Sequence, residues 1–160
     1  MKISRRNISA LALSAVALVG LVMSEGYSDK AIIPIHGDVP TIGFGSTQGV
    51  KMGDTTTPQK ALGRALRDAQ VFEGAVKKCV TAPLYQHEYD AFISLSYNIG
   101  STAFCNSTLV KKVNALDYEG GCREILRWDR AGGRQIPGLT KRRKVEYQQC
   151  MGGQDANMGH

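Results

Sequence analysis

Residues 25–45 read EGYSDKAIIPIHGDVPTIGFG, and most of the predicted architecture follows from them. The stretch begins with Glu25, directly after the uncharged segment Asn7–Ser24, and β-branched residues flank its His36-Gly37-Asp38 sequence. Such runs around a glycine-containing turn predict a β-hairpin within residues 31–47. An acidic residue that abuts an apolar segment is an unusual place for a charge that only improves solubility. We therefore treat Glu25 as the first candidate for a chemical role.

Helical periodicity follows the predicted hairpin. Thr57-Pro58 is a typical helix start, an N-cap followed by proline in the first turn, and apolar residues recur at helical spacing up to Lys78. A second helix is expected from Leu84 to Ile99, ended by Gly100. Shorter helices are expected over Thr108–Asn114, Asp117–Trp128 and Pro137–Met151. A small hairpin followed by helices is an α+β pattern.

The first 24 residues form a segment of different character. Lys2, Arg5 and Arg6 precede an apolar run, which is the order of an export signal. The run is at the lower limit of membrane-spanning length, and its many Ala, Ser and Gly residues make its preference for lipid modest. A cleaved signal peptide, a permanent anchor and a segment that enters and later leaves the bilayer all stay open. The modest hydrophobicity favours the third, with residues 1–24 as leader and residues 25–160 as one domain.

The chain is basic, with a formal net charge of +6. The three basic residues of the leader supply half of this charge, so the remainder is +3, from 17 basic minus 14 acidic residues. A basic surface suits a polyanion such as cell wall or phospholipid. We expect no nucleic-acid partner, because the sequence lacks a nucleic-acid-binding motif and an aromatic-interleaved basic tract.

Four well-separated cysteines occur, at Cys79, Cys105, Cys122 and Cys150. They form no CxxC pair and no histidine stands at a ligand spacing, so we expect neither a metal site nor a cofactor. An even number of cysteines after an export-like segment favours two disulfides in an oxidising compartment.

Several stretches, in one order along the chain, resemble a known family. They are Glu25-Gly26, PTIGFG at 40–45, DAFISLSYNIG at 90–100, FCNSTL at 104–109, RWDRAGG at 127–133 and PGLTKRR at 137–143. Together they resemble the phage lysozymes of glycoside hydrolase family 24 over nearly all of residues 25–150. The resemblance implies a lysozyme-like fold with a small N-terminal β-hairpin lobe and a larger C-terminal helical lobe. It also implies hydrolysis of the β-1,4 bond between N-acetylmuramic acid and N-acetylglucosamine in peptidoglycan.

With its leader, the chain is similar to the signal-anchor-release endolysins of phages that infect Gram-negative bacteria. The similarity implies an enzyme held inactive at the periplasmic face of the host inner membrane by an N-terminal signal-anchor helix, then released into the periplasm. Residues 1–24 contain no cysteine, so release cannot use disulfide exchange with the leader and would act by position and refolding. We expect a monomer whose partners are peptidoglycan and, through residues 1–24, the inner membrane.

Two residues match catalytic positions of this family. Cleavage of a glycosidic bond needs an acid that protonates the leaving oxygen, and Glu25 matches the family's acid. Thr41 matches the threonine that helps to place the attacking water in an inverting reaction.

The family's second carboxylate has no direct match. The family's usual spacing after the glutamate leads to Pro34, and its usual spacing before the threonine leads to Ile35. Neither of these residues has a carboxylate. We favour Asp38, on the predicted turn, as the replacement. Asp29, or no second carboxylate at all, is the alternative.

The resemblance also suggests further site residues and a disulfide pairing. Candidate substrate-binding residues are Tyr97, Asn98, Arg142 and Arg143. The first pairing implied is Cys79–Cys105 with Cys122–Cys150, and the next is Cys79–Cys122 with Cys105–Cys150.

Two other functions stay open at this point. A lytic transglycosylase on a related fold needs one acid/base and no attacking water, which suits the missing second carboxylate. A non-catalytic wall-binding module would keep Glu25 and Thr41 without using them.

Overall fold

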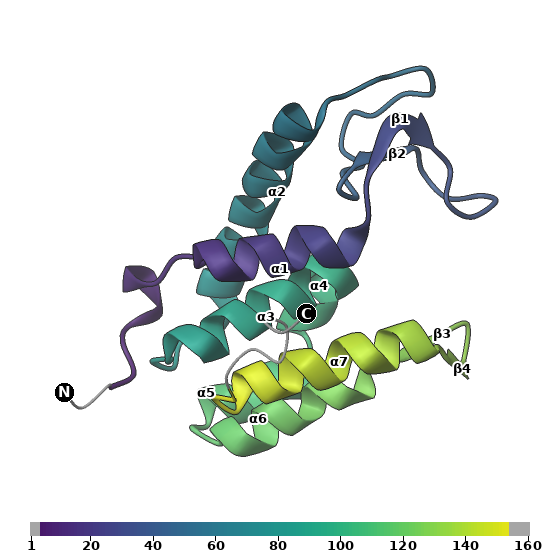
Figure 1. Ribbon diagram of the computed structural model, residues 1–160. Helices are drawn as coiled ribbons and strands as arrows, with labels where there is room; N and C mark the ends of the chain where they lie inside the picture. Colours follow the sequence, from purple (N-terminus) through teal and green to yellow (C-terminus); the bar gives the residue numbers. More distant parts are fainter. Residues whose placement is uncertain (1–3, 154–160) are drawn as a thin grey trace. The chain divides into compact units, whose positions relative to one another are not determined.

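The computed structural model describes residues 4–153 (Figure 1). Lys2, the first basic residue of the leader, lies outside this range. The elements are the 3-10 helix η1 (Ile8–Ala10), α1 (Ala15–Glu25), β1 (Ser28–Ile32), β2 (Thr41–Gly43), α2 (Pro58–Cys79), α3 (Gln86–Ile99), α4 (Ser101–Cys105), α5 (Thr108–Asn114), α6 (Tyr118–Glu124), the 3-10 helix η2 (Ile125–Arg127), β3 (Arg130–Ala131), β4 (Arg134–Gln135) and α7 (Pro137–Cys150).

The chain divides into two compact units. Leu18–Val71 forms one, which we call the hairpin unit. The residues up to Ala17 and those from Phe72 onward form the other, the helical unit. The boundaries therefore fall inside α1 and α2, so each of these helices belongs partly to both units.

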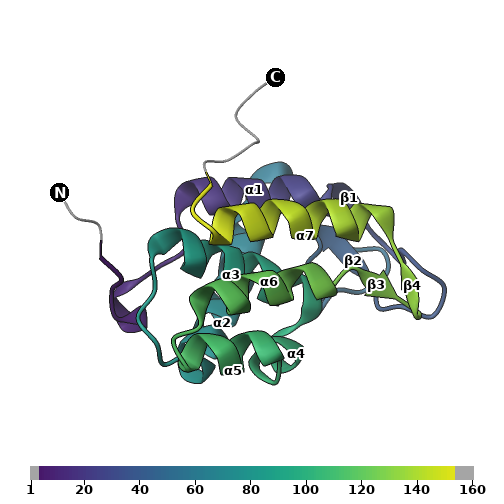
Figure 2. The same ribbon diagram turned by 90° about the horizontal axis from the view of Figure 1, so that it is seen from below.

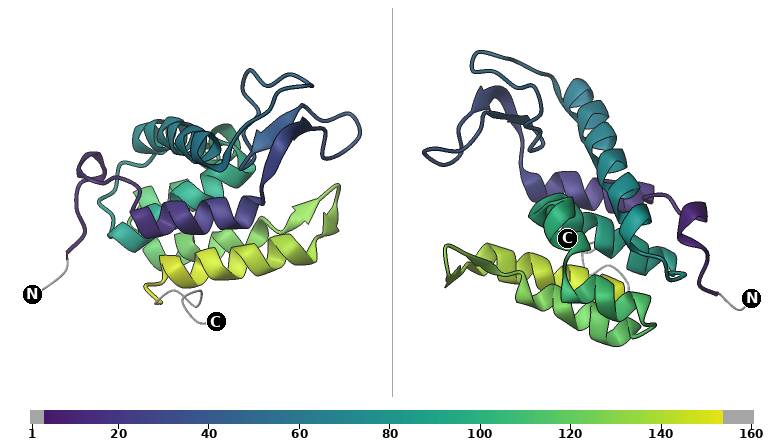
Figure 3. Two further views of the ribbon diagram at one scale, coloured as in Figure 1. Left: turned by 45° about the horizontal axis from the view of Figure 1, so that its top comes forward. Right: turned by 180° about the vertical axis from the view of Figure 1, so that it is seen from behind.

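The hairpin unit is built on the antiparallel strands β1 and β2, which confirms the predicted hairpin. Ser28 pairs with Gly43 and Ile32 with Thr41, with an irregularity between the two pairs. Ala31, Ile42 and Val50 are buried together as a small core. The hairpin starts earlier than predicted, and its connection covers residues 33–40 (Figure 3).

The helical unit has the larger core, centred on α3. This helix lies against α7, and α5 lies against α6 (Figure 2). Its side chains Tyr89, Phe92, Ile93 and Leu95 are all fully buried. Six consecutive residues of α3, Glu88–Ile93, are buried, so this helix is covered on nearly all of its sides and lies at the centre of the unit.

Local signals predict the long helices well. The predictions for α2, α3, α5 and α7 are confirmed to within two residues at each end. Gly100 ends α3 with φ of +91°, a backbone conformation that glycine adopts without strain. The predicted helix Asp117–Trp128 is instead α6 followed by η2. The short α4 and the β3–β4 hairpin were not predicted.

Two disulfides cross-link the helical unit. Cys79 at the end of α2 joins Cys105 at the end of α4, and Cys122 in α6 joins Cys150 at the end of α7. This is the first of the two pairings considered. The sequence separations are 26 and 28 residues. Loops of that size correspond to about 3–4 kcal/mol of stabilisation per bridge on the chain-entropy model.

The basic start of the leader is folded onto the helical unit. Arg5 pairs with Glu88 of α3 at 2.7 Å, and the Glu88 side chain is only 3% exposed. The guanidinium carbon of Arg5 also lies 4.3 Å from the ring centre of Tyr85 and 3.5 Å from that of Tyr118. Two aromatic faces and a carboxylate therefore surround this cation.

The apolar residues that follow add to the same core. Ile8 and Leu11 are 6% and 2% exposed and belong to the core cluster of the helical unit. The backbone of Arg6 exchanges two hydrogen bonds with that of Leu84, at 2.8 and 2.9 Å. The leader thus contributes to the folded helical unit through both its backbone and its side chains.

Helix α1 begins at a polar cap built from Ser14. The Ser14 hydroxyl accepts a hydrogen bond from the backbone N–H of Ala17 at 3.1 Å and donates one to Asp90 at 2.7 Å. The Ser14 backbone N–H also donates to Asp90, at 3.1 Å. Burial raises the pKa of Asp90, and the hydrogen bonds from Ser14 oppose this effect.

A second carboxylate secures the residue before this cap. The backbone N–H of Leu13 donates to Glu73 of α2 at 2.6 Å, and the hydroxyl of Tyr89 donates to the same oxygen at 2.7 Å. Burial, with Glu73 nearby, raises the pKa of Tyr89.

The structure gives no membrane-spanning element within residues 4–153. None of the helices it describes there is both long enough and apolar enough to cross a bilayer.

The contacts of Arg5 predict a stability difference between the two leader arginines. Arg5→Gln removes the cation that faces the buried Glu88 and should lower the free energy of unfolding by about 2–3 kcal/mol. Arg6→Gln is the matched control, since the Arg6 side chain makes one exposed hydrogen bond, to Gln86, and should cost less than about 0.5 kcal/mol. Urea unfolding measures both.

Adding Glu88→Gln to Arg5→Gln should cost less than the sum of the two single changes, because the unpaired charge is then absent. Equal losses for the two arginine variants would show that the ion pair does not hold the leader.

Candidate active site

Glu25 lies where α1 passes into the hairpin. It is the last residue of α1 and is half-buried. Gly26 follows with φ of +70°, a conformation that lets the chain leave the helix and enter β1. The local sequence therefore fixes the carboxylate at a helix end rather than on a loop.

The Glu25 carboxylate lies against the backbone of Gly45. A Cβ atom at Gly45 would stand 3.3 Å from Oε2 of Glu25, and within 3.7 Å of its Cβ. Gly45 also has φ of +86°. The backbone conformation therefore favours glycine at this position, and a larger residue would make a tight contact with the carboxylate.

Thr41 begins β2 in the same hairpin unit. It is half-buried, and its hydroxyl donates a hydrogen bond to the carbonyl of Val39 at 3.2 Å. Two residues on, a Cβ at Gly43 would lie only 2.8 Å from the Cβ of Ala61, so β2 packs directly on α2. Thr41 thus stands on a strand whose position is set by a close backbone contact.

Asp38 lies in the connection between the two strands. It is exposed, and its carboxylate accepts a hydrogen bond from the backbone N–H of Val39 at 2.9 Å. Its own N–H donates to the carbonyl of Ile35 at 2.9 Å. These are turn contacts, so the role of Asp38 as second carboxylate stays a prediction. Asp29, the alternative, is an exposed residue of β1.

The candidate binding residues of α3 differ in exposure. The ring of Tyr97 packs against that of Phe72, with 5.2 Å between the centroids. Asn98 is exposed. Their proposed contacts with substrate stay predictions.

The two arginines of α7 face Glu146 on the same helix. Arg143 is fully buried and lies 2.8 Å from a Glu146 oxygen, while Arg142 is partly buried and lies 3.3 Å from the other. Ser94 of α3 donates to Glu146 at 2.7 Å. Burial raises the pKa of Glu146, and Arg143 opposes that shift. The burial of Arg143 argues against direct contact with a ligand, and substrate binding by either arginine stays a prediction.

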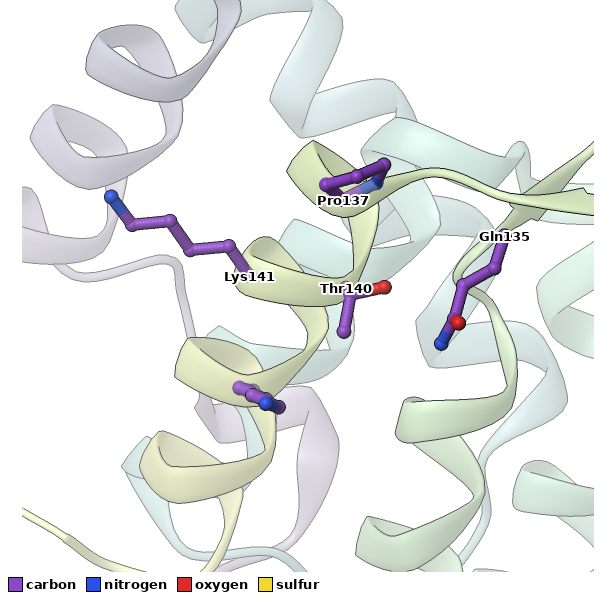
Figure 4. Close-up of a pocket in the computed structure, with 5 residues that line it drawn as sticks. Gln135, Pro137, Thr140 and Lys141 are labelled. Atoms are coloured by element: carbon purple, nitrogen blue, oxygen red, sulfur yellow. The ribbon is translucent and has the colours of Figure 1, made fainter.

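A hollow of about 400 Å³ lies at the start of α7 (Figure 4). It is lined by Gln135, Pro137, Thr140, Lys141 and Lys144. Asp129 accepts hydrogen bonds from Gln135 at 2.5 Å and from Thr140 at 3.1 Å. The bond from Gln135 lowers the pKa of Asp129. Two of the lining side chains are therefore already bound within the chain.

A metal site was also considered. Among the described residues, no three His, Cys, Asp or Glu side chains gather closely enough to hold a metal ion.

Comparison with known families identifies the chain. The family model described as phage lysozyme matches residues 22–146, which is most of the sequence and includes Glu25, Asp38 and Thr41. The chain belongs to the phage lysozyme family. It is therefore a glycoside hydrolase that acts on peptidoglycan.

Individual relatives of this lysozyme agree. A SAR-endolysin of Pseudomonas phage phiKMV is 37% identical over 141 residues, which cover 86% of this chain and 87% of that protein. An endolysin of Acyrthosiphon pisum secondary endosymbiont phage 1 is 39% identical over 110 residues, 66% of this chain and 75% of that one. The solved endolysin of Escherichia coli O157:H7 phage FAHEc1 superposes with a TM-score of 0.78 at 33% identity, covering 89% and 94% of the two chains. The α+β lysozyme-like fold is thereby confirmed.

Two features of the site were not anticipated from the sequence. The contact of Gly45 with Glu25 joins residues 20 positions apart, and only the glycine spacing in PTIGFG hinted at it. The pairing of Arg143 with Glu146 was visible in principle, because residues three apart on a helix are neighbours.

The Gly45 contact predicts an effect on this lysozyme's turnover. Gly45→Ala should strain the backbone by about 1–2 kcal/mol and also push against the Glu25 carboxylate, reducing kcat on peptidoglycan by about tenfold or more. Gly53→Ala is the matched control, since its φ of +97° imposes a similar strain with no atom within 4 Å of the new methyl group. Turnover of purified peptidoglycan and thermal unfolding of both variants check this. Equal turnover in the two variants would contradict it.

Proposed function

We propose that this lysozyme is a phage endolysin that hydrolyses the β-1,4 bond between N-acetylmuramic acid and N-acetylglucosamine, with Glu25 as general acid. The observation that carries the proposal is the position of the Glu25 carboxylate. It is half-buried at a helix end and close to Gly45, in the same unit as Thr41. A carboxyl group held on a helix end can serve as the acid that protonates the glycosidic oxygen.

Hydrolysis with inversion needs a water molecule on the opposite face of the sugar. In our proposal Asp38 binds and activates this water, and Thr41 helps to orient it. Their positions support this, because both follow Glu25 on the hairpin and stand three residues apart. The turn contact of Asp38 uses one carboxylate oxygen, and the other oxygen can accept a proton from water.

One observation favours a second candidate, a lytic transglycosylase. The Asp38 carboxylate is exposed and already bonded within its own turn, as an ordinary turn residue would be. Without a second carboxylate, Glu25 would act alone as acid and then base, and the sugar's own hydroxyl would attack in place of water.

Mass spectrometry of digested peptidoglycan separates the two reactions. We expect reducing N-acetylmuramic acid ends from the wild-type enzyme and no product from Glu25→Gln. Asp38→Asn should lose about 100-fold or more in kcat, as removal of a general base does. Asp29→Asn, an exposed aspartate of the same hairpin, is the matched control and should keep its activity. Ends of the 1,6-anhydro type would favour the transglycosylase, and binding without any product would favour a wall-binding module.

We further propose that residues 1–24 form a signal-anchor-release segment with two positions. In the first the leader lies in the host inner membrane and holds the enzyme inactive at the periplasmic face. In the second it has left the bilayer and the enzyme is free in the periplasm. Relatives named SAR-endolysins over nearly the whole chain support this, as do two disulfides suited to an oxidising compartment.

The contacts of the leader support its retention rather than its cleavage. A cut before Glu25 would remove Arg5, Ile8 and Leu11 from the helical unit and delete the Ser14 cap. The buried Glu88 and Asp90 would then lose partners, at a cost of several kcal/mol. A leader that returns to these contacts after release avoids that cost.

Fractionation of expressing cells tests the two positions. Before the membrane potential is collapsed we expect the full-length chain in the membrane fraction, and afterwards the same full-length chain in the soluble periplasmic fraction. Intact mass measurement distinguishes release from cleavage. A chain that is soluble from the start and lacks its leader would exclude the tether.

A further inference from the structure

The first turns of α2 carry a basic hollow of about 440 Å³ that the proposed reaction does not use. It is lined by Thr55, Thr56, Gln59, Lys60, Gly63, Arg64 and Arg67. Three of these side chains are cations, and none is a carboxylate. The hollow lies wholly within the hairpin unit. We call it the α2 basic hollow.

Its cations have no acidic partner among the residues that the structure describes. Across residues 4–153, none of Lys60, Arg64 and Arg67 forms an ion pair with a carboxylate. Other arginines of the chain do form such pairs. Arg64 instead donates a hydrogen bond to the backbone carbonyl of Gln48. The spacing of Lys60 and Arg64 makes them like-charged neighbours on the helix, which destabilises it by about 0.2–0.5 kcal/mol. An anion from outside the chain would offset this repulsion.

The side chains offer the donors that bind an oxyanion. Arginine presents planar N–H groups that match a carboxylate in a bidentate manner, and lysine adds a point charge. Gly63 has no side chain to cover the helix surface beside these cations. A Cβ atom at this position would lie 3.8 Å from Nη1 of Arg67. The guanidinium of Arg67 therefore lies next to an open strip of helix backbone.

The hollow is joined closely to the hairpin that carries Thr41. The backbone N–H of Thr56 donates to the carbonyl of Asp29 in β1 at 2.9 Å, and Thr55 pairs with Lys30 as an isolated bridge. On the other strand, Gly43 packs directly against Ala61 of α2. A polymer strand held at the hairpin would thus have a fixed relation to the hollow.

We propose that the α2 basic hollow binds carboxylate groups of the peptides attached to the glycan strand of peptidoglycan. This assignment rests on the proposed function, because it takes the substrate to be that polymer. The glycan backbone itself is largely uncharged, whereas its peptides end in carboxylates. The hollow therefore favours glycan strands whose peptides carry free carboxylates over strands whose peptide carboxylates are blocked, by ion pairing within the hairpin unit.

The test is a comparison of two substrates. Lys60→Gln, Arg64→Gln and Arg67→Gln are combined in one variant, and its kinetics are measured on untreated peptide-bearing glycan strands and on the same strands after their peptide carboxylates have been converted to amides. The matched control combines Lys51→Gln, Lys78→Gln and Lys111→Gln, three exposed lysines outside the hollow. Circular dichroism and thermal unfolding establish that both variants are folded.

We expect KM on untreated strands to rise about tenfold in the hollow variant, with kcat unchanged. On strands with amidated peptides its KM should equal that of the control. An equal rise on both substrates, or a rise that the control matches, would overturn the assignment. Unchanged kinetics of the hollow variant together with lost binding to phosphatidylglycerol vesicles would also overturn the assignment. That result would assign the hollow to lipid phosphate. A wild-type enzyme that releases no product from either substrate would overturn the proposed function itself, before any variant is compared.

Discussion

Helix α1 starts where Ser14 meets Asp90 and ends at Glu25, so one hydrogen-bonded cap sets the start of the element whose last residue is the candidate acid. With a rise of about 1.5 Å per residue, Glu25 lies about 15 Å along the axis from the first turn. The end of the leader and the candidate acid therefore lie on one helix.

The sequence predicted the elements that depend on local signals. The N-cap at Thr57 and the C-terminal Gly100 marked the ends of two long helices, and the turn around Gly37 marked the hairpin. Helix α4 has five residues, and strands β3 and β4 have two residues each. None of these elements is long enough for a hydrophobic period to be recognised in the sequence. The disulfide pairing came from family resemblance, since spacing alone leaves alternatives open.

The site was predicted only in part, because contacts that depend on packing leave no local signal in the sequence. Glu25 and Thr41 stand in a recognisable motif, but the approach of Gly45 to Glu25 depends on how the end of α1 meets the turn that follows β2. The burial of Arg143 likewise depends on packing, although its helical spacing from Glu146 can be read from the sequence. Charge counting found a basic chain, and only the fold shows that Lys60 and its neighbours gather without a carboxylate among them.

The ion pair between Arg5 and Glu88 has a consequence for membrane topology. In the folded form the basic end of the leader lies on the same side of any bilayer as α3, whereas a spanning leader keeps its basic end in the cytoplasm. If the leader leaves the bilayer as proposed, conversion between these forms carries Lys2, Arg5 and Arg6 across the membrane. Against a potential of about 100 mV, negative inside, three such charges oppose the transfer by roughly 7 kcal/mol, and this opposition vanishes on depolarisation. The release that we propose would thereby be sensitive to membrane voltage.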